Sequence, residues 1–87
     1  MPKVFNLNGF YCMVYTLDHD PPHVHIKYSG TTTILNLGAS SEDIAIRDPQ
    51  NMKTKDIKKA MELLEENWDD AVAKWEEYHG QIKRHDR

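Results

Sequence analysis

The stretch H-V-H-I-K-Y, residues 23–28, alternates between apolar and polar side chains. Successive side chains of a β-strand point to opposite faces, so this stretch predicts a strand with two different faces. The apolar face would carry Val24, Ile26 and Tyr28, and the polar face would carry His23, His25 and Lys27. We expect the apolar face to meet a hydrophobic core and both imidazoles to share the uncovered face, open to solvent or ligand.

Strand-like segments surround this stretch. Residues 10–17 are aromatic and β-branched, and residues 31–37 are rich in threonine and isoleucine. Ser29-Gly30 between them is a turn signal, and residues 43–47 form a further short segment before Asp48-Pro49 breaks the chain. The region 3–48 therefore predicts an antiparallel meander of three or four strands.

The region 54–79 has helical periodicity. Thr54 is the expected N-cap. Apolar residues then recur at helical spacing, at Ile57, Ala60, Met61, Leu64, Trp68, Ala71, Val72 and Trp75. We expect two helices that meet near Asn67, or alternatively one long bent helix, ending at Gly80 before a frayed tail over 80–87. Residues 1–87 are thus expected to form one α+β domain.

Composition narrows the classes of function. The 87 residues are 39% apolar and 29% charged, with a net charge of −3 and no apolar run long enough to span a bilayer. A single cysteine, Cys12, excludes an internal disulfide and is expected to be a small buried side chain. We expect a cytoplasmic protein that binds neither membranes nor duplex DNA, because it lacks a broad basic surface. Residues 42–77 carry eleven acids and six bases, which favours a solvated face or a basic partner.

The histidine cluster permits a metal site. Imidazole is a common ligand of zinc and other divalent transition metals. His23 and His25 would point the same way, and His19, Asp18 or Asp20 could add a third ligand from the preceding turn. Three protein ligands with an open position is the arrangement of a catalytic zinc site.

The same residues also permit metal-free acid–base catalysis. His23 and His25 could act as base and acid, with Lys27 offsetting the charge of a phosphate. This set is sufficient to cleave RNA through its own 2′-hydroxyl. A third interpretation is structural: the two prolines stiffen a turn whose histidines only satisfy backbone groups or Asp18. Trp68 and Trp75, seven residues apart, fit a core or a homodimer interface better than nucleobase stacking.

The motif D-H-x-P-P-H-x-H, followed by an apolar residue, Tyr28 and Gly30, resembles a family of small prokaryotic proteins called domain of unknown function 4160. Gly9-Phe10 before the first strand and Trp75-Glu76 near the end of the helical half are also similar. Val24 stands where the family often has an aromatic residue. The resemblance implies no established activity, but it implies membership of candidate toxin–antitoxin pairs. This chain would then be the toxin-like half, acting on RNA or a related phosphate ester and binding an antitoxin-like partner.

Overall fold

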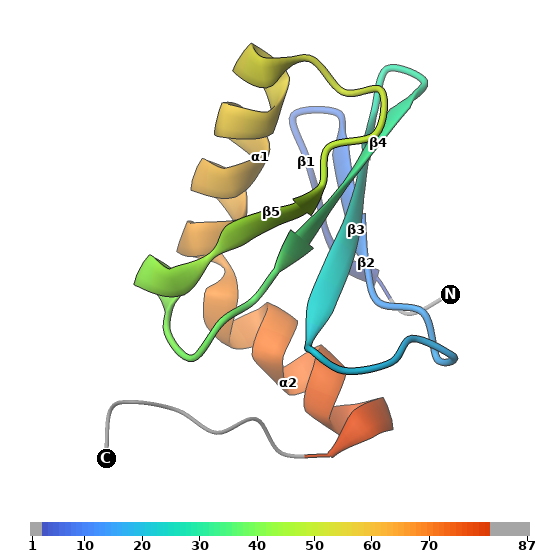
Figure 1. The fold of residues 1–87 in the computed structure, drawn as a ribbon, viewed down its shortest axis with the longest axis vertical. Helices are drawn as coiled ribbons and strands as arrows, with labels where there is room; N and C mark the ends of the chain where they lie inside the picture. Colours follow the sequence, from blue (N-terminus) through green and yellow to red (C-terminus); the bar gives the residue numbers. More distant parts are fainter. Residues whose placement is uncertain (1–2, 81–87) are drawn as a thin grey trace.

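The computed structural model describes residues 3–80 and contains a sheet followed by two helices (Figure 1). The strands are β1 (Lys3–Leu7), β2 (Phe10–Met13), β3 (His23–Tyr28), β4 (Thr31–Asn36) and β5 (Ala45–Asp48). A 3₁₀ turn, η1 (Ser41–Asp43), precedes β5, and the helices are α1 (Thr54–Glu66) and α2 (Trp68–His79). The predicted α+β class is confirmed. The predicted frayed tail lies, after Gly80, outside the described residues.

The sheet is an antiparallel meander in the order β1-β2-β3-β4-β5. It has five strands, so the prediction of three or four was too low. The additional strand, β1, pairs with β2 through a hairpin whose two turn residues, Asn8 and Gly9, have φ of 53° and 84°. Asn-Gly is the preferred sequence for a two-residue hairpin turn, because both positions require positive φ. This signal was present in the sequence.

The strand predicted over 10–17 is shorter than expected. β2 ends at Met13 because the chain turns over the next residues. The Asp18 amide donates a hydrogen bond to the Tyr15 carbonyl at 3.1 Å, and the Tyr15 amide donates to Asp18 Oδ2 at 3.0 Å. The turn places Asp18 beside the start of β3, and the following Asp20–Pro21 peptide is cis.

The helices cover one face of the sheet. Val24, Ile26 and Leu35 are fully buried in one hydrophobic cluster with residues of both helices, as the alternation of residues 23–28 predicts. Tyr28 packs at the edge of this cluster, stacked on Phe10 with ring centroids 4.0 Å apart. Figure 1 shows α1 running alongside the sheet and α2 lying at the end of the sheet where β3 begins.

The two helices meet at Asn67, where the sequence predicts the bend. Asn67 has φ −115° and ψ 22°, and its side-chain amide donates to the Leu63 carbonyl at 2.8 Å. Thr54 is the first helical residue rather than the N-cap, which is Lys53. Gly80 is the C-cap of α2, as expected, with φ of 90°. Among the described residues, no helix has both the length and the hydropathy to cross a bilayer.

Both tryptophans belong to the core of the chain. Trp68 donates its indole N–H to the Leu37 carbonyl at 2.8 Å and so ties the start of α2 to the end of β4. Trp75 is 1% exposed. Trp68 is 7% exposed. The homodimer interface that the sequence suggested for these two rings would therefore contain almost no tryptophan surface. Cys12 is buried, as predicted, and burial raises the pKa of its thiol.

Candidate functional site

His23 and His25 lie together on the face of β3 opposite Val24 and Ile26. Their ring centroids are 5.2 Å apart, so the shared side that strand alternation predicts is present. The expectation of an open face is wrong for His23, whose residue is only 5% exposed. The His25 side chain retains 15% exposure, so one ring of the pair reaches the surface and the other lies beneath it.

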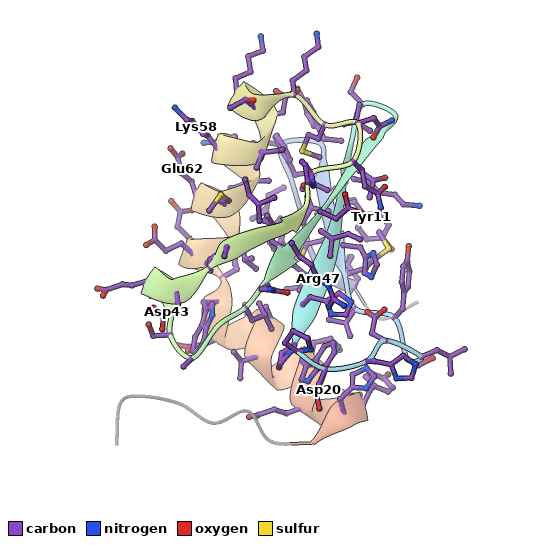
Figure 2. The ribbon with its side chains drawn as sticks, viewed as in Figure 1. Tyr11, Asp20, Asp43, Arg47, Lys58 and Glu62 are labelled. Carbon is purple, nitrogen blue, oxygen red and sulfur yellow. The ribbon has the colours of Figure 1, made fainter. Side chains whose placement is uncertain are left out.

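Three segments bury His23. The turn between β2 and β3 lies over it and contributes Asp18, whose side chain is itself 11% exposed. Trp75 of α2 approaches from the end of the sheet, with its ring centroid 5.3 Å from that of His23. Arg47 reaches in from β5 (Figure 2). The sequence could not indicate this cover, because two of the three segments come from distant parts of the chain.

Asp18 is the centre of the polar cluster. Its Oδ1 atom lies 3.4 Å from His23 Nε2 and 3.2 Å from His25 Nε2. Its other oxygen, Oδ2, accepts the hydrogen bond from the Tyr15 amide, which fixes the direction of the carboxylate. Both imidazoles therefore direct the same ring nitrogen at one carboxylate oxygen.

Arg47 is a site residue that the sequence interpretation missed. Its Nη1 atom lies 2.7 Å from His23 Nδ1 and 3.4 Å from the Pro21 carbonyl, and His23 Nδ1 is 2.9 Å from that same carbonyl. Arginine only donates, so His23 Nδ1 either accepts from Arg47 or donates to Pro21, according to the tautomer. With Nδ1 accepting, the Nε2–H of His23 points toward Asp18.

The surroundings of His25 favour its neutral form. Burial lowers the pKa of His25 below its ordinary value of 6.5, and the hydrogen bond to Asp18 only partly opposes this effect. The Tyr15 ring lies against the imidazole, with centroids 4.2 Å apart. A neutral imidazole is the form that binds a metal or accepts a proton.

A second layer supports the cluster from α2. The His79 ring lies 4.1 Å from the Trp75 ring, and His79 Nε2 lies 3.1 Å from the Tyr15 carbonyl. The last turn of α2 is thus tied to the turn that carries Asp18. No pattern in the sequence indicates that residues 15 and 79 meet.

Asn36 lies directly opposite His23 in the register of β3 and β4. Directly opposed residues of an antiparallel pair have side chains on the same face. Its Oδ1 atom is the one buried side-chain oxygen or nitrogen within residues 3–80 that has no hydrogen-bond partner. Buried polar atoms are nearly always paired, so this carbonyl provides an acceptor beside the cluster for a bound group.

Three of the candidate residues lie outside the cluster. His19 is exposed on the turn, as is its neighbour Asp20. Lys27 is exposed farther along β3 and lines a surface pocket with Tyr11 and Gly30 at the hairpin end of the sheet. Of the five ligands considered from the sequence, the structure brings together Asp18, His23 and His25, whose candidate ligand atoms all lie within 4.8 Å of one another.

The comparisons place this chain in a family. The sequence model described as Domain of unknown function (DUF4160) matches residues 9–76, which include the site and most of both helices. No curated protein and no solved structure matches the chain. The chain belongs to the family described as Domain of unknown function (DUF4160).

Proposed function

We propose that the protein binds one divalent transition metal ion through Asp18, His23 and His25. The observation that carries the proposal is the convergence of two Nε2 atoms on one Asp18 oxygen, at 3.4 and 3.2 Å. Two ligand atoms that each lie 2.0–2.1 Å from a tetrahedral zinc ion are about 3.3 Å apart. The two distances from Asp18 therefore suit an ion held between the carboxylate and the two imidazoles, each of which would carry its proton on Nδ1.

The surroundings of His23 fit a ligand role. A histidine that binds a metal through Nε2 carries its proton on Nδ1 and usually donates it to a carbonyl or carboxylate. The Pro21 carbonyl is in position for this bond, 2.9 Å from Nδ1. Arg47 also lies at Nδ1, and two donors repel, so Arg47 has to turn away when the ion is bound.

Three protein ligands leave at least one position for water or substrate. A metal ion with such an open position would polarise a phosphoryl or carbonyl group bound there, or lower the pKa of a water molecule bound there. The Arg47 guanidinium, once released from His23 Nδ1, would be free to pair with an anionic group. These features favour hydrolysis of a phosphate ester as the reaction class, with zinc as the first metal to test.

Metal analysis of the full chain, purified without a histidine tag, tests this proposal. We expect one zinc or other transition metal ion per chain after loading and dialysis, and loss of binding in His25→Ala and in Asp18→Asn. His19→Ala is the matched control, since His19 is exposed one residue from Asp18 and should leave the stoichiometry unchanged. Binding below one equivalent in wild type, or equal loss in the control, would contradict the proposal.

A second candidate function is metal-free cleavage of RNA or another phosphate ester. The hydrogen bond of His25 to Asp18 and the lowered pKa of its imidazole favour it, because a neutral imidazole can accept a proton. His23 would then be the acid. Arg47 is better placed than Lys27 to offset phosphate charge, since it contacts His23 directly. RNA cleavage that survives a chelator supports this function, and cleavage that zinc restores supports the metal proposal.

The toxin-like role requires a separate experiment in cells. Expression of the wild type should slow growth and reduce RNA integrity, whereas His23→Ala/His25→Ala should do neither at equal protein level. Equal growth of the two strains would remove the toxin-like role, and with it the reason to expect an antitoxin-like partner. Metal binding in vitro does not depend on this outcome.

A further inference from the structure

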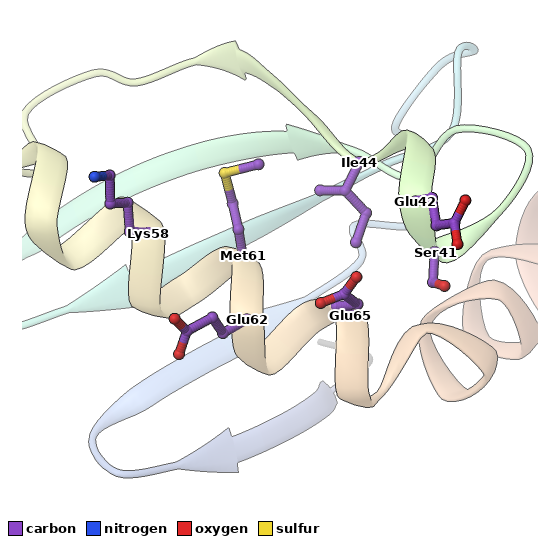
Figure 3. A pocket seen from close by; sticks show the side chains of 7 residues that line it. All are labelled: Ser41, Glu42, Ile44, Lys58, Met61, Glu62 and Glu65. Atoms are coloured by element: carbon purple, nitrogen blue, oxygen red, sulfur yellow. The ribbon is translucent and has the colours of Figure 1, made fainter.

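A groove lies between α1 and the segment that leads into β5. It has a volume of about 330 Å³ and is lined by Ser41, Glu42, Ile44, Lys58, Met61, Glu62 and Glu65. Figure 3 shows Met61 on α1 and Ile44 before β5 directed into the space between the two elements. Both side chains pack at the edge of the core, so the groove has an apolar floor.

The strand beside this groove has an unpaired edge. Within residues 3–80, β5 is the last strand of the sheet and pairs with β4 alone, and all four of its residues are exposed. Ile46 lies opposite Leu35, a core residue, and so projects from the helix-covered face, where it is still 49% exposed. An edge strand with free backbone groups can accept a further strand from another chain.

The charges that line the groove favour a partner strand with basic side chains. Glu42, Glu62 and Glu65 line it against one base, Lys58. Glu62 also lies 3.7 Å from Lys59, in a pair whose two side chains are 48% and 65% exposed. Such exposed pairs are weak and exchange readily. The groove therefore matches a segment with an apolar side chain between Lys or Arg residues, spaced so that all three point toward α1.

We propose that the outer edge of β5 and this groove bind an extended basic segment of a partner protein. The segment adds a strand to β5, places its apolar side chain between Ile44 and Met61, and directs basic side chains at Glu62 and Glu65. The two positions that flank the apolar residue must be two residues away from it, because only alternate side chains of a strand share a face. This inference is independent of metal binding and of catalysis.

The probe is the synthetic peptide Ser-Lys-Thr-Ile-Thr-Arg-Ser, in which Lys, Ile and Arg share one face. Its control is Ser-Thr-Lys-Ile-Arg-Thr-Ser, which has the same composition and charge but puts Ile on the face opposite Lys and Arg. Titration of the full chain, followed by NMR, should shift the amides of β5 and the Met61 methyl group with the first peptide and at least fivefold more weakly with the second. N-methylation of alternate peptide amides should abolish binding, because it removes strand pairing.

Charge variants locate the surface. Glu62→Gln/Glu65→Gln should weaken binding of the first peptide by about 3- to 10-fold, the scale of two exposed charge pairs. Asp70→Asn/Glu77→Gln, which removes the same charge from exposed positions of α2, should change it less than twofold. Equal affinity for the two peptides, equal effects of the two variants, or shifts outside β5 and α1 would overturn the proposal.

Two other occupants of the groove and the β5 edge would give different experimental results. If the chain's own basic residues compete for the groove, Lys83→Gln/Arg84→Gln should strengthen peptide binding severalfold. If a second copy pairs along β5, the wild type should have the mass of a dimer, and the peptide should dissociate it. Either result would overturn a partner segment as the natural occupant.

Discussion

On one face of β3, Val24 and Ile26 are fully buried among apolar side chains, whereas on the other His23 and His25 meet a carboxylate and a guanidinium. The apolar face needs only volume and hydrophobicity, which many sequences can supply. The polar face needs particular atoms at particular distances, and its partners come from the preceding turn, β5 and α2. The apolar face packs β3 into the fold, and the polar face contributes side chains to the candidate site.

The largest effect should come from the apolar face. Leu35→Ala removes a fully buried side chain next to Val24 in the sheet and should lower the free energy of unfolding by about 2–5 kcal/mol. For a chain of 87 residues this is a large share of the total stability. Urea denaturation followed by tryptophan fluorescence measures it. A loss below about 1 kcal/mol would mean that the helix-covered face does not carry the fold.

The polar face should contribute less to stability. His23→Ala leaves Asp18 and Arg47 without one partner each, so we expect a loss of about 1–3 kcal/mol in metal-free buffer. The same urea experiment measures it beside Leu35→Ala. A loss larger than that of Leu35→Ala would reverse the comparison and assign the histidine cluster to the core rather than to a site.

Much of the fold follows from local patterns. Alternation over residues 23–28 predicts which side chains meet the helices, and helical periodicity with Asn67 predicts two helices. β1 was missed because Lys3–Leu7 mixes polar and apolar residues, although Asn8-Gly9 marks its hairpin. Such errors at the edge of a sheet do not change the class of the fold.

The site was less predictable for a physical reason. His23, His25 and Asp18 are close in sequence, so strand geometry and one turn bring them together. Arg47 reaches His23 only through the register of β5 on β4, which shifts between Ile34 and Leu35. The burial of His23 by Trp75 depends on the direction that α2 takes after Asn67. Neither feature has a local signal in the sequence.

A smaller effect on stability should come from protonation of His25 on the polar face. Because burial is the largest cause that lowers the pKa of His25 below 6.5, the unfolded chain binds more protons than the folded one as pH falls through 6.5. The contribution of His25 to stability is therefore complete above this pH and is lost as pH falls below it. NMR titration of the imidazole should give a midpoint under 6.5.

Asp18→Asn should lower that midpoint further, since the carboxylate is what raises the pKa of His25 against burial. Lys27→Ala is the matched control and should leave the midpoint unchanged. A higher midpoint in Asp18→Asn would show that Asp18 does not stabilise the charged imidazole. The neighbours that affect the same titration are His23 and Arg47, both of which lower it by their charge.

The smallest effect should come from His19 and Lys27, two residues that the sequence offered for the site and the fold leaves exposed. His19→Ala and Lys27→Ala should each change the free energy of unfolding by less than about 0.5 kcal/mol, because they remove no buried contact. Each should also leave zinc affinity within twofold of wild type, measured by calorimetry. A tenfold loss of zinc affinity in His19→Ala would contradict the three-ligand proposal, because His19 would then be a further ligand supplied by the turn. The polar face would then extend beyond β3, and its separation from the exposed turn would no longer hold.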